Sequence, residues 1–137
     1  MISTYDPRKI SISLGSHSVS GYAEDSFVTI EKNGEGISKI VGCDGEIVRN
    51  INPDLTYTLK LKLLASSPTN AFLWNKYTKD LSSGQGTFPV LISDLRGKAE
   101  FSAAVVWVVK PAKRIFGRTA ENMEWELETG AASWELE

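Results

Sequence analysis

Alternation of apolar and polar residues with a period of two constrains the fold of this 137-residue chain more than any other feature. Such alternation places one face of a strand on a core and the other in water, as in half-buried antiparallel sheets. The pattern is clearest at residues 10–14, 28–31, 57–63 and 123–128. Residues 99–110 differ because both alternating sets are apolar, and this predicts a strand covered on both faces.

One segment follows a helical period instead. Ser67 followed by Pro68 is a favourable helix start, since serine caps the first turn and proline fits the first helical position. Leu73, Tyr77 and Leu81 then recur at intervals of four, and Gly84 can end the helix in the left-handed conformation. The spacing predicts a helix over about 68–81.

About eight strands and one helix fit a single domain spanning 1–137, because this length suits one hydrophobic core. The turns are dense, as at Asn33-Gly34 and Asp44-Gly45. The sequence therefore predicts a mainly β fold: an antiparallel β-sandwich or barrel with one flanking α-helix. A long inter-subunit loop is expected at about 32–46.

Two segments outside the predicted core are candidates for contacts with other chains. The loop at 32–46 is rich in glycine and too long for a tight hairpin, yet it carries apolar residues with no local core. It is either a solvated arm or an arm that docks on another subunit. Its candidate contact residues are Glu35, Ile37, Ile40 and Val41. The N-terminal residues Tyr5, Asp6, Pro7 and Arg8, with an aromatic ring, a rigid proline and two charges, are expected to contact a neighbouring subunit.

The sequence contains few candidates for catalytic or metal-binding residues. The chain has one histidine, His17, and one cysteine, Cys43, and neither has a partner at the spacing of a triad or a metal site. His17 is expected in a turn and Cys43 as an inert thiol. We expect no enzyme activity, no catalytic or metal-binding residues and no cofactor. No apolar run approaches the length of a membrane span, and no membrane anchor is expected.

The charge is nearly balanced, with a net value of −2, and gives no general argument for nucleic-acid binding. Its distribution is uneven, because residues 121–137 hold six glutamates and no lysine or arginine, whereas residues 1–120 carry about +4. The acidic end is either a solvated surface, or a deliberately negative surface or one that docks on the basic surface of a neighbour.

Several collinear stretches resemble tail tube proteins of contractile-tailed bacteriophages, a family of phage and prophage structural proteins. The resemblance covers nearly the whole chain, although no single motif is diagnostic. It is carried by residues 4–9 (TYDPRK), 19–23 (VSGYA), 27–33 (FVTIEKN), 41–46 (VGCDGE), 66–70 (SSPTN), 86–89 (GTFP), 101–103 (FSA), 116–117 (FG) and 124–125 (EW).

The resemblance implies a structural role in the virion tail, with assembly in the cytoplasm of the host bacterium. Six subunits would form a ring, and stacked rings would form a hollow tube surrounded by a contractile sheath. The partners implied are further copies of the chain, tail sheath, baseplate and tail terminator proteins, and genomic DNA that passes without specific binding. The inner tube of a phage-derived bacteriocin or secretion device, and a monomeric β-sandwich binding module, remain alternatives.

In many such tubes the bore is acidic, because a negative wall repels phosphate and lets DNA slide. The polar faces of the predicted strands supply the candidates for the bore. These lumen-facing candidates are Thr29, Glu31, Glu46, Asn50, Glu124, Glu126 and Glu128. The alternative is that these residues lie on the outer, sheath-facing surface. Thr58, Lys60 and Lys62 form another polar strand face and could pair with the glutamates across the sheet.

Overall fold

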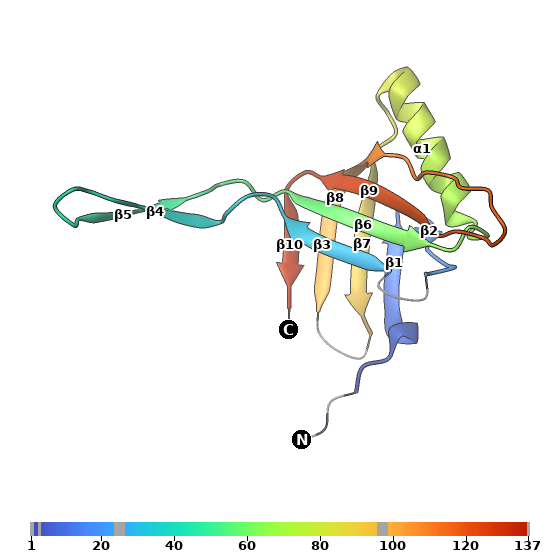
Figure 1. Cartoon of the computed structure of the whole chain (residues 1–137), viewed down its shortest axis with the longest axis horizontal. Coiled ribbons are helices and arrows are strands. Elements are labelled where there is room, and N and C mark those ends of the chain that lie inside the picture. The colour runs from blue at the N-terminus through green and yellow to red at the C-terminus, as the bar shows by residue number, and fades with distance from the viewer. Residues whose placement is uncertain (1, 3, 24–26, 96–98, 137) are drawn as a thin grey trace.

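The computed structural model describes residues 2, 4–23, 27–95 and 99–136. Within them one α-helix and one short 3-10 helix accompany ten strands (Figure 1). The 3-10 helix η1 spans Pro7–Lys9 and the α-helix α1 spans Thr69–Ser83. The strands are β1 (Ile10–Leu14), β2 (His17–Ser18), β3 (Val28–Lys32), β4 (Ile37–Val41), β5 (Ile47–Ile51), β6 (Tyr57–Leu63), β7 (Phe88–Asp94), β8 (Glu100–Lys110), β9 (Met123–Thr129) and β10 (Ala132–Glu135).

Eight of the strands form one antiparallel sheet that folds over on itself. The strand order is β2-β1-β7-β8-β9-β6-β3, and β10 pairs with β8 beside this path. The first half of the long strand β8 pairs with β7 and β10, and its second half pairs with β9. In Figure 1 the strands β1, β7 and β10 run across the direction of β3, β6 and β9. The predicted mainly β fold, a sandwich with one flanking helix, is confirmed.

The period-two pattern is fulfilled most directly in β6 and β9. Leu59, Leu61 and Leu63 of β6 are buried, as are Trp125 and Leu127 of β9. Their polar neighbours point away from the core because successive side chains of a strand alternate between its two faces. These two strands pair directly, with Leu61 opposite Trp125, so both inner faces contribute to one core.

Strand β8 corrects the expectation of a strand covered on both faces. Phe101 and Ala103 are buried in its first half, whereas Val106 and Val108 are buried in its second half. The inward set therefore changes parity between the two halves, where the pairing with β7 also shifts register. Such an irregularity admits an extra residue into one strand, and it turns Trp107 to the outer face, where its partner is Glu128.

Helix α1 begins at Thr69, one residue later than predicted, with Pro68 rather than Ser67 at the N-cap position, and it ends at Gly84 as predicted. The hydroxyl of Ser67 accepts a hydrogen bond from the Thr69 amide at 3.2 Å, and Gly84 ends the helix at a φ of 71°. Leu73 is fully buried, but Leu81, predicted to share its apolar stripe, is 71% exposed. The last turn of α1 extends beyond the strands, so Leu81 meets no core (Figure 1).

His17, expected in a turn, instead begins β2 and anchors the start of the helix. Its Nε2 lies 2.9 Å from the hydroxyl of Thr69, and its ring stacks on Phe72 with the centroids 4.6 Å apart. The hydroxyl of Ser67 donates to the Ser20 carbonyl. These contacts join the N-terminal end of α1 to the segment after β2 and show that the histidine has a structural role.

A two-stranded arm, β4 and β5, projects from the sandwich (Figure 1). β4 and β5 pair only with each other, so the arm contributes no strand to the main sheet. The predicted bounds of 32–46 are too short, because the pairing continues to Ile51. The sequence pattern placed Glu46 and Asn50 on the polar face of a sheet strand, because the alternation is the same in an isolated ribbon as in a half-buried strand.

Candidate functional site

The apolar side chains of the arm are largely exposed to water. Its six apolar residues are each 55–72% exposed: Ile37, Ile40, Val41, Ile47, Val48 and Ile51. An isolated two-stranded ribbon is marginally stable in water, and exposed apolar patches mark interaction surfaces. The candidate contact residues Ile37, Ile40 and Val41 all lie on β4, and Glu35 lies at the root of the arm.

The two faces of the arm differ in chemistry. Residues directly opposite in an antiparallel pair point to the same side, and alternate residues along a strand share a face. One face carries Ile40 and Val48 with Ser38 and Asn50. The other face carries four aliphatic side chains around two cations: Ile37, Ile51, Val41, Ile47, Lys39 and Arg49.

The root of the arm is held by polar contacts. The Asn52 amide donates to the Gly36 carbonyl at 2.8 Å, so the two chains enter the arm side by side. The carboxylate of Asp54 accepts from the Thr56 amide at 2.9 Å and from the Thr56 hydroxyl at 2.6 Å. These hydrogen bonds favour the charged carboxylate and hold the pKa of Asp54 below its ordinary value.

The Asp54 contacts predict a pH response at the root of the arm. A carboxylate whose folded pKa is lowered supplies its contacts at neutral pH and loses them as the pH falls through that pKa. We expect the Thr56 amide resonance to titrate with a midpoint below that of an ordinary aspartate. In Asp54→Asn the titration should vanish while the core resonances stay in place. A Thr56 midpoint at or above the ordinary value would contradict this assignment.

The outer face of β3, β6 and β9 brings together most of the predicted lumen candidates. Thr29 and Glu31 lie on β3, and the other three on β9 are Glu124, Glu126 and Glu128. Lysines of the neighbouring strands oppose these glutamates: Lys62 faces Glu124, and both Lys60 and Lys110 face Glu126. Four carboxylates therefore share this face with three lysines, so it is mixed in charge rather than an acidic wall.

Two lumen candidates lie elsewhere. Glu46 precedes β5 and Asn50 lies within it, so both belong to the arm and not to the face that carries Glu124. The grouping of these residues with the sheet glutamates is wrong, because β5 left the main sheet to pair with β4.

The N-terminal candidates form an ordered, exposed segment. Asp6 caps η1, its carboxylate accepting from the Arg8 amide at 3.0 Å and from the Arg8 guanidinium. Pro7 is the first residue of η1, where a fixed φ is favourable. Tyr5 is 67% exposed and lies near Phe27 at the edge of an open hollow. The contact of these residues with a neighbouring subunit stays a prediction.

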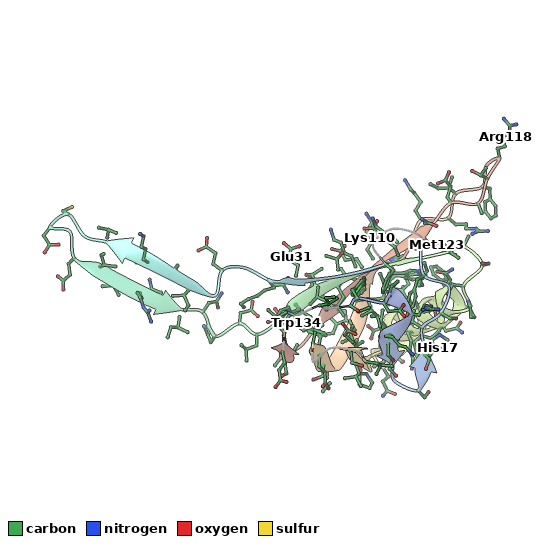
Figure 2. All side chains as sticks on the ribbon, turned by 90° about the horizontal axis from the view of Figure 1, so that it is seen from below. His17, Glu31, Lys110, Arg118, Met123 and Trp134 are labelled. Carbon is green, nitrogen blue, oxygen red and sulfur yellow. The ribbon has the colours of Figure 1, made fainter. Side chains whose placement is uncertain are left out.

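Sequence reasoning missed a basic loop between β8 and β9. Residues 110–118 contain four basic residues and no acid: Lys110, Lys113, Arg114 and Arg118. Phe116 is 84% exposed, and the Arg114 guanidinium lies over its ring at 4.8 Å. Figure 2 shows Arg118 at the end of the molecule opposite the arm. The run of basic residues was visible in the sequence, but the nearly neutral net charge of the whole chain obscured it.

Metal-binding and membrane-spanning features were predicted to be absent. Among the residues that the structure describes (2, 4–23, 27–95 and 99–136), no three His, Cys, Asp or Glu side chains are grouped to hold a metal ion. Within the same residues no helix is both long and apolar enough to cross a membrane. Cys43 is exposed at the tip of the arm.

The fold is that of proteins which end the tube of contractile injection systems. The sheath/tube terminator of an extracellular contractile injection system, PVC, superposes with a TM-score of 0.68 at 10% identity, covering 98% of each chain. The tube-terminating cap of the anti-feeding prophage superposes with a TM-score of 0.63 at 10% identity, covering 98% of this chain and 94% of the cap.

The sequence is similar to that of a phage structural protein. "Structural protein ORF10" of Pseudomonas phage KPP10 is 24% identical over 133 residues, which cover 91% of this chain and 77% of the phage protein. No family model matches the sequence. The predicted resemblance to phage structural proteins is confirmed, and the relative and the two solved structures named here are structural proteins rather than enzymes.

Proposed function

We propose that this chain is a ring-forming structural subunit of a contractile phage tail, built into the tail tube. The phage structural protein matched in sequence and the terminators matched in fold support a place in the tail. The subunit would reside in the virion after assembly in the cytoplasm of the host bacterium. Six copies would form each ring, and DNA would pass through the bore during ejection.

The observation that carries this proposal is the arm. It projects from a sandwich whose core is complete without it, and it holds six exposed apolar residues. In a binding module that acts as a monomer, these six apolar residues would stay exposed to water, which is unfavourable. We infer that the arm docks on an adjacent subunit or ring, with Glu35, Ile37, Ile40 and Val41 among the contacts. Tyr5, Asp6, Pro7 and Arg8 would contact a second neighbour.

The outer face of β3, β6 and β9 is the proposed wall of the bore, with Thr29, Glu31, Glu124, Glu126 and Glu128 exposed to DNA. Its lysines reduce the net negative charge without making the face basic. Such a wall gives phosphate no strong binding site, which suits a conduit. The opposite side of the ring would meet the sheath, and its ends would meet baseplate or tail terminator proteins.

A terminator ring is the second candidate function. The two solved structures compared above are a sheath/tube terminator and a tube-terminating cap, and each is covered over nearly its whole length. A tube subunit and a terminator differ in what they do alone: the first stacks without limit, whereas the second stops at a ring. Electron microscopy of the purified chain at high concentration separates them, since tubes favour the first and isolated rings the second.

Excision of the arm tests its role in assembly. Residues 37–51 can be replaced by two glycines, because Gly36 and Asn52 are already joined by a backbone hydrogen bond. We expect the melting temperature to change by no more than about 3 °C, since no core residue is removed. Rings or tubes should be lost completely in electron micrographs and in sedimentation velocity.

A milder variant replaces Ile40 and Val48 by threonine. It keeps the two-stranded arm but reduces the apolar surface on one of its faces. We expect this variant to assemble more weakly than the unchanged protein and more strongly than the excision. If the excised chain formed normal tubes or rings, the arm would have no part in assembly. A protein that stays monomeric at every concentration would favour the binding-module alternative.

A further inference from the structure

We propose that the arm of one copy docks through Lys39 and Arg49 on Glu100 and Glu135 of a second copy. This contact rests on the proposed function, because it names the surface that receives the arm. Both charge pairs lie on described strands, and they belong to different parts of the molecule.

The cationic pair lies on the more apolar face of the arm. Lys39 and Arg49 are direct partners in the β4–β5 ladder, and both are exposed. Like charges directly opposite on a two-stranded ribbon destabilise it. No ion pair between described residues relieves this repulsion. Two apolar pairs flank the cations on the same face, namely Ile37 with Ile51 and Val41 with Ile47.

The acidic pair has the same arrangement on the sandwich. Glu135 of β10 is the direct partner of Glu100 of β8, and both are exposed. They point away from the core, because the next pair along the ladder, Trp134 with Phe101, packs inward. Here too no ion pair among the described residues offsets the repulsion.

The two pairs match in spacing as well as in charge. Directly opposed side chains of an antiparallel ladder have their Cβ atoms about 4.5–5.5 Å apart, so two cations at this spacing can face two carboxylates at the same spacing. Each pair is unfavourable alone, and the contact would relieve both. Leu91, 41% exposed on β7, offers an apolar contact near Glu100 for the aliphatic residues of the arm.

The shape of the molecule makes a second copy the occupant. The arm projects away from the sandwich and does not fold back on it (Figure 1). A contact between the arm of one copy and the β8–β10 surface of the next joins different patches, which is a heterologous interface. Such interfaces close into rings or extend into stacks. A nucleic acid would satisfy the cations but not the four aliphatic residues around them.

Charge exchange tests this contact. The first variant is Lys39→Glu/Arg49→Glu, the second is Glu100→Lys/Glu135→Lys, and the third combines all four changes. Each double variant would place like charges against each other across every contact. We expect each to need a protein concentration about a hundredfold higher for half-assembly, measured by sedimentation velocity. Circular dichroism should show that all three are folded.

Restoration is the decisive result. The fourfold variant should assemble near the wild-type concentration, and an equimolar mixture of the two double variants should co-assemble, since each arm then meets an opposite charge. Lys79→Glu/Lys113→Glu carries the same change in net charge outside the contact and should assemble normally. The contact is overturned if both double variants assemble like the wild type, or if all are folded and neither restoration occurs. A wild type that never assembles contradicts the proposed function itself, and the contact with it.

Discussion

Trp125→Ala should destabilise the protein by about 3–5 kcal/mol, the range for truncating a large aromatic side chain in a packed core. Trp125 is 1% exposed, and it lies opposite Leu61 at the centre of the sandwich. Its indole also donates a hydrogen bond to Asn70 at 2.9 Å, which links β9 to the first turn of α1. Removing the ring would leave both a cavity and an unpaired amide oxygen.

This loss is a large part of the roughly 5–15 kcal/mol that stabilises a typical domain. We expect the melting temperature to fall by about 10–20 °C in differential scanning calorimetry, with a matching fall in soluble yield. Trp74→Ala is the matched control, because Trp74 is 50% exposed on α1 and should cost little. Trp125→Phe keeps most of the packing without the hydrogen bond and should fall between the two. Equal stability of both alanine variants would contradict the placement of Trp125.

Gly86→Ala should have a comparable effect for a different reason. A Cβ atom at this buried glycine would lie 2.1 Å from the Lys76 carbonyl oxygen and 2.8 Å from the Asp80 amide nitrogen. These are backbone atoms of α1, so the clash cannot be relieved by rotating a side chain. Either the helix or the start of β7 must move, and we expect a cost of about 3 kcal/mol or more.

The measurement is chemical denaturation, with the midpoint compared between Gly86→Ala and the control Gly117→Ala. Gly117 lies in the basic loop, and a Cβ there would meet nothing within 4 Å. The control should therefore keep the wild-type midpoint. If Gly86→Ala unfolded at the same denaturant concentration as the control, the close approach of α1 to the segment before β7 would be wrong.

Much of the fold is determined by local sequence. The alternation at 10–14, 57–63 and 123–128 predicts strands because a strand in a half-buried sheet imposes a period of two regardless of its partners. Gly84 predicts the end of α1, and the Ser67-Pro68 pair predicts its start to within one residue, because capping depends on a few neighbouring residues. The exposed arm was predicted in outline because Ile37, Ile40 and Val41 had no core residues nearby in sequence.

Only the tertiary structure determined which strands pair in the main sheet and which side chains of each strand point into the core. β5 has the alternation of a sheet strand, yet it pairs with β4 in the arm. Glu46 and Asn50 therefore lie in the arm and not on the face that carries Glu124. Trp107 turned outward because an irregularity in the β7–β8 ladder reversed the parity of β8. Sequence determines the period of a strand, but pairing partners and bulges depend on contacts between segments far apart in the chain, and these form only when the sandwich closes.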